Sequence, residues 1–315
     1  AVDVKFSGEY YAAGMYLDRT NVNKTSYTIP ATLTTPAKLV DEGPSTAFYF
    51  QRLRLNTQFI VSPGLTLTTR ADVMERGWGA NRTAPGIAQD TMSAGTRSEN
   101  ENIAFDLLYV SYVSPIGMFN VGYQIDDVWG TVWGNSSNPK GKIAYFFKTG
   151  GLTLILQTGK DKELSRSVTN PTGDTDKDQS FYTAAGVYRW KTGEAGLLFK
   201  YIKNNQYRNV YGAFAQDAGF TWDGLVTTPY VKAKLGPVAL EAQIYYLYGK
   251  KSWEGNSAGV PAAIEPNTQD VDLNQLTAYI DATVDLGMFY VGGTAAYVSG
   301  DDPSTLDEQE GGVLG

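Results

Sequence analysis

Apolar and polar residues alternate with a period of two through most of this chain, a pattern typical of half-buried β-strands. Most of the alternating segments approach the length of about 9–11 residues that a tilted strand needs to cross a bilayer. Thirteen strands are expected, at residues 3–16, 47–61, 65–76, 102–113, 118–127, 142–148, 152–159, 180–190, 194–203, 225–235, 238–249, 274–285 and 288–299.

The connections between these strands follow a rhythm. After every even-numbered strand the chain turns within a few residues, and each turn contains a glycine, which tight hairpins favour. Longer polar segments, such as 18–46, 77–101, 160–179 and 250–273, follow odd-numbered strands. Outer-membrane barrels have short periplasmic turns and long external loops. The rhythm predicts an all-β fold, a transmembrane antiparallel up-and-down β-barrel with residues 1–315 in one domain and a periplasmic N-terminus.

One face of the expected strands is almost free of charge. In the first strand this face carries Val4, Phe6, Gly8, Tyr10 and Ala12. The one charge found in the same register is Glu75, at a strand end. Because Arg or Lys facing lipid at mid-bilayer costs about 2–4 kcal/mol, this depletion favours a membrane barrel over a soluble β-sandwich.

Tryptophan supports the same interpretation, because indoles collect at membrane–water interfaces. Five tryptophans at expected strand ends are predicted to form an aromatic girdle: Trp78, Trp129, Trp190, Trp222 and Trp253.

The opposite register is expected to line the pore. The predicted pore-lining residues are Glu9, Arg52, Arg54, Gln58, Arg70, Asp72, Asp106, Gln124, Lys200, Lys232, Glu241, Tyr245 and Asp281. Hairpin geometry places Lys232 near Glu241 and Arg54 near Asp72. Two interpretations stay open. Such pairs can hold the wall rigid and neutral, or Arg52, Arg54 and Arg70 can form a basic cluster that favours anions.

Composition narrows the function classes. The chain has no cysteine and no histidine, so it lacks thiol chemistry and the commonest general base and metal ligand. We expect no enzyme activity, no cofactor and no metal. The net charge of −7 argues against a nucleic-acid partner. Asp174, Asp176 and Asp178 have the spacing of half a calcium loop but lack its glycine and distal glutamate, which favours a solvated acidic loop.

Two segments carry a resemblance. Residues 7–17, Ser-Gly-Glu-Tyr-Tyr-Ala-Ala-Gly-Met-Tyr-Leu, resemble the first strand of deltaproteobacterial porins. Residues 297–302, Tyr-Val-Ser-Gly-Asp-Asp, are similar to a strand-to-loop step in alginate-export-type barrels. The whole chain resembles Gram-negative outer-membrane porins. The porin resemblance implies diffusion of small hydrophilic solutes, and the alginate-export likeness implies passage of an anionic polysaccharide.

The chain departs from that family at its end. Such barrels end in a strand with a terminal aromatic residue, whereas this sequence ends Gly311-Gly312-Val313-Leu314-Gly315. Bacterial single-chain barrels have an even number of strands, and an open sheet edge in lipid is prohibitive. We therefore expect roughly three to five further strands, for a total of about 16 or 18.

The leading hypothesis is a passive outer-membrane porin for small hydrophilic solutes, with mild anion selectivity as a further hypothesis. The alternatives are a channel dedicated to an anionic saccharide or other solute class, and a structural barrel that sheathes or anchors a partner protein. Outer-membrane lipid and lipopolysaccharide are the expected surroundings, and a homotrimer is the assembly considered. A long loop such as 18–46 or 250–273 is the candidate to fold inward and constrict the pore.

Overall fold

The computed structural model describes residues 2–18, 27–29, 31–32, 36, 38–40, 45–78, 103–163, 176–208, 219–253, 270–305 and 307–312. Within these ranges strands dominate, and one short 3₁₀ helix is present. The elements are β1 (Asp3–Leu17), β2 (Tyr27–Ile29), β3 (Lys38–Val40), β4 (Thr46–Ser62), β5 (Leu65–Gly77), β6 (Ile103–Ser114), β7 (Gly117–Ile125), η1 (Val132–Gly134), β8 (Pro139–Thr149), β9 (Leu152–Lys162), β10 (Gln179–Trp190), β11 (Gly193–Asn204), β12 (Phe220–Leu235), β13 (Val238–Trp253), β14 (Val271–Asp285), β15 (Tyr290–Val298) and β16 (Glu308–Gln309). No helix in these ranges has the length and apolarity of a membrane span.

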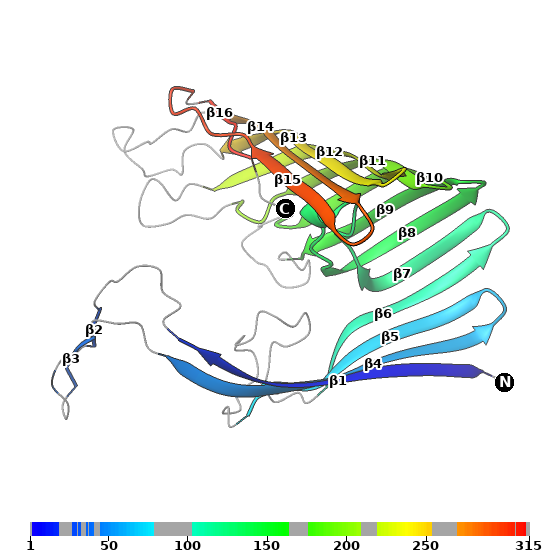
Figure 1. The fold of residues 1–315 in the computed structure, drawn as a ribbon, viewed down its shortest axis with the longest axis horizontal. Coiled ribbons are helices and arrows are strands. Elements are labelled where there is room, and N and C mark those ends of the chain that lie inside the picture. Colours follow the sequence, from blue (N-terminus) through cyan, green and yellow to red (C-terminus); the bar gives the residue numbers. More distant parts are fainter. Residues whose placement is uncertain are drawn as a thin grey trace. The chain divides into compact units, whose positions relative to one another are not determined.

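The long strands form one antiparallel, up-and-down sheet (Figure 1). Its order is β1-β4-β5 and then each strand in turn to β15, while β16 pairs with β14 and β2 pairs with β3 in a separate hairpin. The predicted all-β, up-and-down fold is confirmed. Strands β1 and β15 lie at the two ends of this path, so the sheet of described strands is open. The expectation that further strands complete a barrel stays a prediction.

The chain divides into two compact units. The first comprises residues 1–60 and 68–106, and the second comprises residues 61–67 and 107–315. The first therefore holds β1 to β3 with most of β4 and β5, and the second holds β7 to β16. The expectation of one barrel domain stays a prediction.

The predicted turns are where the sequence indicated. Gly64 and Gly236 take φ angles of 83° and 61°, which glycine adopts without steric cost. Strand ends on the loop side extend beyond the predicted bounds. β8 begins at Pro139 and β12 at Phe220, because these residues still pair with Ile125 and Trp253 although their sequence no longer alternates.

The two faces of the second unit's sheet differ in chemistry. We call one the outer face. Exposed apolar side chains cover it, among them Leu154, Leu156, Leu197, Phe199, Ile244 and Ile280. We call the other the inner face. Its buried side chains are largely polar, among them Lys142, Thr153, Thr183, Gln243 and Thr277. An exposed apolar surface of this extent marks contact with an apolar surrounding or a partner.

Charges reach the outer face only in a row near the loop ends of the strands. Ser180 pairs with Lys160 on one side and Lys203 on the other. The row continues across β12, β13 and β14 through the direct partners Asp223, Lys250 and Asp272. Between this row and the turns, the outer face of β11 carries Ala195, Leu197, Phe199 and Tyr201. The row therefore marks one edge of an apolar band.

Candidate functional site

The candidate site is built around the connection between β7 and β8. This segment, residues 126–138, is called the crossing loop. Its base is closed by two backbone hydrogen bonds, from the Asp126 N–H to the Asn138 carbonyl at 2.8 Å and from the Ser136 N–H to the Asp127 carbonyl at 3.0 Å. The loop also contains η1, which Thr131 caps by accepting the Trp133 N–H at 3.3 Å. The loop is therefore an ordered excursion with a paired base.

The crossing loop lies across the inner face of β11 to β14. Four residues that are direct cross-strand partners there, Gly196, Tyr230, Gln243 and Tyr279, are called the seat row. The loop contacts the row in chain order, as the following three contacts show.

Trp129 packs edge-on against Tyr230, with ring centroids 5.2 Å apart. The Gln243 Oε1 accepts both the backbone N–H of Thr131, at 2.7 Å, and its hydroxyl, at 2.8 Å. Trp133 stacks on Tyr279 with centroids 5.5 Å apart. Every second loop residue from Trp129 to Trp133 therefore contacts the next strand, from β12 to β14.

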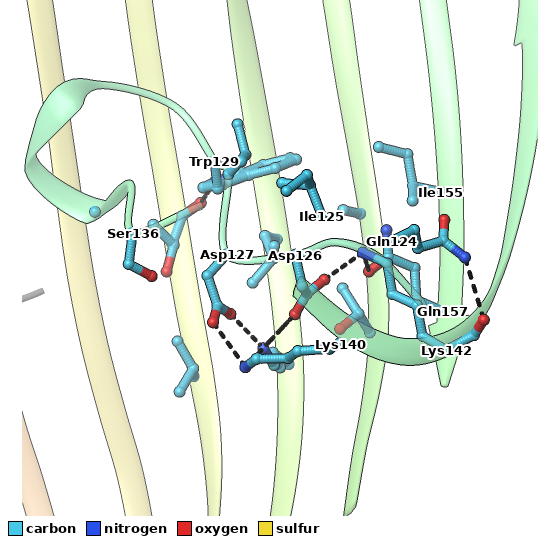
Figure 2. Close-up of a pocket in the computed structure, with 18 of the residues that line it drawn as sticks. Gln124, Ile125, Asp126, Asp127, Trp129, Ser136, Lys140, Lys142, Ile155 and Gln157 are labelled. Atoms are coloured by element: carbon cyan, nitrogen blue, oxygen red, sulfur yellow. Dashed lines mark hydrogen bonds and ion pairs between the residues drawn. The ribbon is translucent and has the colours of Figure 1, made fainter. Parts of the chain in front are cut away.

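A cluster of charged residues holds the base of the crossing loop, and Figure 2 shows four of its members, Asp126, Asp127, Lys140 and Lys142. The Asp126 carboxylate lies 2.5 Å from the Lys142 Nζ and 3.1 Å from the Lys200 Nζ. Asp127 lies 2.9 Å from Lys200 and 2.7 Å from Lys140. Lys140 also pairs with Asp161 at 2.7 Å. Three lysines of the wall and three aspartates, two of them from the loop, form this cluster, which is called the lysine cluster.

The lysine cluster is largely buried, with Asp126 6% and Lys142 7% exposed. Burial by itself would raise the pKa of the Asp126 carboxyl, but the ammonium groups of Lys200 and Lys142 hold that pKa below its ordinary value. Lys200 also lies over the ring of Phe181, 4.5 Å from its centroid. The Asp126 carboxylate therefore stays ionised while it ties the loop to β8 and β11.

A cavity of about 550 Å³ lies between the crossing loop and the inner face. Its lining combines the charges of the lysine cluster with apolar residues of the wall, including Leu107, Phe146, Ile155 and Leu198. The inner face is thus partly apolar in the region that the crossing loop covers.

A second row of side chains crosses the inner face on the turn side of the seat row. It follows direct cross-strand partners from β10 to β15, and these are Arg189, Glu194, Lys232, Glu241, Asp281 and Thr294. This row is called the charged belt. Lys232 and Glu241 are partners, as predicted, but the Lys232 ammonium bonds to the Gly130 carbonyl of the loop at 2.8 Å and lies 3.5 Å from Glu194.

The first unit carries the arginines that the sequence singled out. Arg54 forms two hydrogen bonds to Asp72, at 2.7 and 2.6 Å, which confirms the predicted pair. Arg70 bonds to Asp106 at 2.7 Å. Together with Arg52 and Glu75 these residues are called the arginine ladder. Each arginine has a carboxylate partner, which favours the interpretation of a rigid, neutral wall.

Glu75 does not lie in the register that its place in the sequence predicted. It was expected in the charge-free register, but its carboxylate lies 3.4 Å from the Arg52 guanidinium, which belongs to the opposite register. The preceding residue, Met74, has a φ of 55°. A left-handed angle interrupts the extended backbone, so the side chains beyond Met74 no longer follow the regular alternation of the strand. The charge-free outer register is therefore cleaner than the sequence suggested.

The other predicted pore-lining residues divide between the units. In the first, Glu9 pairs with Arg54 and Gln58 with Lys5 across strands. In the second, Gln124 and Tyr245 line the cavity with Lys200, while Glu241 and Asp281 belong to the charged belt. Whether these side chains line a conducting pore stays a prediction.

Three of the predicted girdle tryptophans lie elsewhere. Trp129 belongs to the crossing loop, where its indole N–H donates to the Thr228 carbonyl at 2.9 Å. Trp222 packs against the buried cluster around Val226 on the inner face. Trp253 packs against Phe220 in the same register, with centroids 5.2 Å apart. Strand-end position does not distinguish the two faces of the sheet, and whether these three tryptophans belong to an aromatic girdle stays a prediction.

Trp78 and Trp190 have the expected exposed position. Trp78 is 58% exposed and stacks on Tyr49, and Trp190 is 38% exposed and stacks on Tyr188. Tyrosines also occupy the outer face, where Tyr182 stacks on Tyr201.

The inward segment itself was missed. The sequence pointed to residues 18–46 or 250–273, most of which lie outside the described residues, whereas the crossing loop is a shorter connection. A signal was present, because Val128-Trp129-Gly130 is repeated as Val132-Trp133-Gly134. Apolar residues in a connection outside the strands need a surface to pack on. Asp127, Lys140, Lys142 and Thr131 were missed for the same reason.

The acidic segment near Asp174 is described only in part. Asp174 lies outside the described residues. The Asp176 carboxylate accepts hydrogen bonds from Lys203, at 3.2 Å, and from the Asn205 amide, at 2.8 Å. Asp178 pairs with Lys160. These contacts fit an ion-paired acidic loop.

No protein-family model matches the sequence, and no curated protein matches it. Solved structures do. One is OmpT, an outer membrane protein of Vibrio cholerae in trimer form, 12% identical, covering 99% of this chain and 94% of that chain, with a TM-score of 0.38. Another is a mutant of the Rh. blastica porin, 10% identical, covering 94% and 95%, with a TM-score of 0.33. These values are too low to assign a function. The narrower resemblance to deltaproteobacterial or alginate-export barrels stays a prediction.

Proposed function

We propose that this chain forms a passive channel for small hydrophilic solutes in a bacterial outer membrane, and that the crossing loop narrows the channel. The observation that carries the proposal is the combination of an outer face that is free of charge between its charged row and the turns with an inner face on which an ordered loop is seated. Neither feature has a use in a soluble sandwich, where the exposed sheet face carries charges.

The height of the apolar band supports a membrane location. β11 runs from Lys203 in the outer charged row to Gly193 at the turn. This is about 33 Å of strand at about 3.3 Å per residue. A tilt of about 40° shortens it to about 25 Å, the height of the lipid-facing band of outer-membrane barrels. With the short turns on the periplasmic side, the N-terminus is periplasmic and the charged row faces the cell exterior, next to lipopolysaccharide.

The inner face supports a channel for small polar solutes. Its charged side chains are mostly paired with opposite charges, in the lysine cluster and part of the charged belt. The arginine ladder of the first unit is paired in the same way. Balanced walls attract water and polar solutes without strong preference for one sign of charge. We therefore propose weak ion selectivity. The homotrimer stays a prediction.

The experiment is reconstitution of the full chain into planar bilayers and liposomes. The proposal expects discrete conductance steps, a small reversal potential in a salt gradient and liposome swelling with small sugars but not with large ones. A reconstituted, folded protein without conductance would contradict it and favour a structural barrel. Conductance blocked by one saccharide at low concentration would favour a dedicated channel.

A further inference from the structure

We propose that Gln243 is the positioning residue of the crossing loop and that the seat row makes this loop a fixed strut, not a movable lid. The inference rests on the proposed channel function, because it concerns what sets the channel's width. The residues at the base of the loop determine where it leaves the wall. Gln243 determines where it lies on the opposite strands.

The first support is the burial of the contact. Gln243 and Thr131 are each 2% exposed, so water cannot replace the hydrogen bonds between them. One oxygen, Gln243 Oε1, accepts both donors of Thr131, the backbone N–H and the hydroxyl. Unless water entered, lifting the loop would leave buried polar groups without hydrogen-bond partners. Leaving them unpaired is unfavourable. The contact therefore opposes displacement of the loop.

The second support is the fit of the loop backbone against this amide. Gly130 has a φ of 65°, and a Cβ there would come within 2.5 Å of Gln243 Oε1. A Cβ on Gly134 would come within 2.7 Å of Gln243 Nε2. Two glycines thus let the loop backbone approach the two ends of one side-chain amide. A seat of this kind is specific to one loop position, since any side chain at either glycine would displace it.

The third support is the room made for Trp129. On β11, a Cβ on Gly196 would meet the Tyr230 ring at 2.3 Å and the Trp129 ring at 3.0 Å. The indole N–H of Trp129 donates to Thr228, and the next residue, Pro229, has no N–H to give to the strand ladder. The pairing of β12 with β13 is interrupted between Thr227 and Tyr230. The wall is thus shaped to receive the loop.

The loop is held on both sides of Gln243. The lysine cluster holds its first residues, Lys232 bonds to the Gly130 carbonyl, and Trp133 stacks on Tyr279. A lid needs one end or one face that can detach. Here contacts recur at nearly every residue from Asp126 to Trp133, so detachment requires breaking them together.

The first test compares single-channel recordings of Gln243→Leu with those of Gln275→Leu. Gln275 is also a buried glutamine of the inner face, at 4% exposure on β14, and serves as the matched control for loss of folding. Gln243→Leu should conduct with added transitions to a larger conductance, their frequency raised about tenfold to a hundredfold by the unpaired Thr131 donors. Gln275→Leu should conduct steadily. Equal, steady recordings from both variants would overturn the assignment.

Two variants of Thr131 test the same contact while Gln243 is unchanged. Their result therefore does not depend on whether the Gln243→Leu variant folds. Thr131→Val removes the hydroxyl but retains the backbone hydrogen bond, so it should produce fewer added transitions than Gln243→Leu. Thr131→Ser restores the hydroxyl and should restore steady conductance. If Thr131→Val and Thr131→Ser behave alike, the hydroxyl contact does not position the loop.

A crosslink tests whether the loop is fixed in the native protein. The chain has no cysteine, so cysteines introduced at 131 and 243 can be bridged by a short thiol-reactive linker without side reactions. The bridged protein should regain the steady native conductance, and the unbridged pair should show the added transitions. Spontaneous closures that the native protein shows and the bridged variant lacks would indicate a lid. Absence of all conductance would contradict the proposed function instead, which separates the two failures.

Discussion

The arginine ladder of the first unit and the lysine cluster of the second balance buried charge in different ways. In the ladder, acid and base both belong to strands of the wall, as in Arg54 with Asp72 and Arg70 with Asp106. In the lysine cluster, two of the acids, Asp126 and Asp127, belong to the crossing loop.

The difference shows what ion pairs can do in a sheet. Pairs within the wall neutralise it and hold strands in register. Pairs between wall and loop fix the loop instead. Their loss displaces the crossing loop, because no strand ladder holds it in place. The same residue types therefore have a structural role in one unit and a positioning role in the other.

The largest effect is expected for Asp126→Asn. It leaves Lys142 and Lys200 buried with too few anionic partners, which should cost about 3–5 kcal/mol in the free energy of unfolding. Asp72→Asn in the ladder should cost less, about 1–3 kcal/mol, because Arg54 is a quarter exposed and keeps Asp106 at 3.8 Å. Urea unfolding in lipid vesicles measures both. Equal losses would remove the distinction between the two clusters.

A smaller effect is expected for Trp129→Phe. The variant loses the indole hydrogen bond to Thr228, worth about 1 kcal/mol, while the ring contact with Tyr230 remains. Trp190→Phe, on the outer face, should change the unfolding free energy by no more than about 0.5 kcal/mol. The same urea titrations check the pair. A larger loss at Trp190 would contradict the placement of Trp129 in the loop seat.

The arginine ladder offers a test of ion selectivity. Arg54→Gln leaves Asp72 without its main partner and should shift the reversal potential toward cations. The double variant Arg54→Gln/Asp72→Asn keeps the net charge of the wall and should return the potential close to the native value. If the double variant stays as shifted as the single one, the arginines act as an anion-attracting cluster and the mild anion selectivity first considered gains support.

The smallest effect is expected from acid. The pKa of Asp126 is held below its ordinary value by Lys200 and Lys142, after burial has opposed its charge. A carboxyl with a depressed folded pKa contributes stability above its unfolded pKa, near 3.9, and loses it only as pH falls through the folded pKa. Conductance should therefore stay steady from pH 7 to about pH 4. Current noise that rises as the pH falls, with a midpoint above about pH 5, would contradict this prediction.

Much of the fold could be predicted from the sequence. A strand with one face in an apolar surrounding has apolar and polar residues that alternate with a period of two. The Gly-containing turns and the Arg54–Asp72 pair followed from the same alternation. Glu75 could not be placed, because the left-handed backbone angle at Met74 leaves no mark in the pattern of apolar residues.

The site was harder to predict for a different reason. The seat row brings together Gly196, Tyr230, Gln243 and Tyr279, which are neighbours only through strand register across four strands. Their loop partners lie about a hundred residues away, as Trp129 does from Thr228. Only the repeated Val-Trp-Gly of the loop indicated that this connection packs against something, and nothing in its sequence indicated where.

The most direct test of the central claim is the conductance of a chain in which residues 129–134 are replaced by two glycines. This variant keeps Asp126 and Asp127 with their lysine partners and removes the part of the loop that lies on the seat row. The account predicts folded channels with a larger single-channel conductance and swelling of liposomes by larger sugars. A variant that folds and keeps the native conductance and size limit would contradict it, because the crossing loop would then not set the width of the channel.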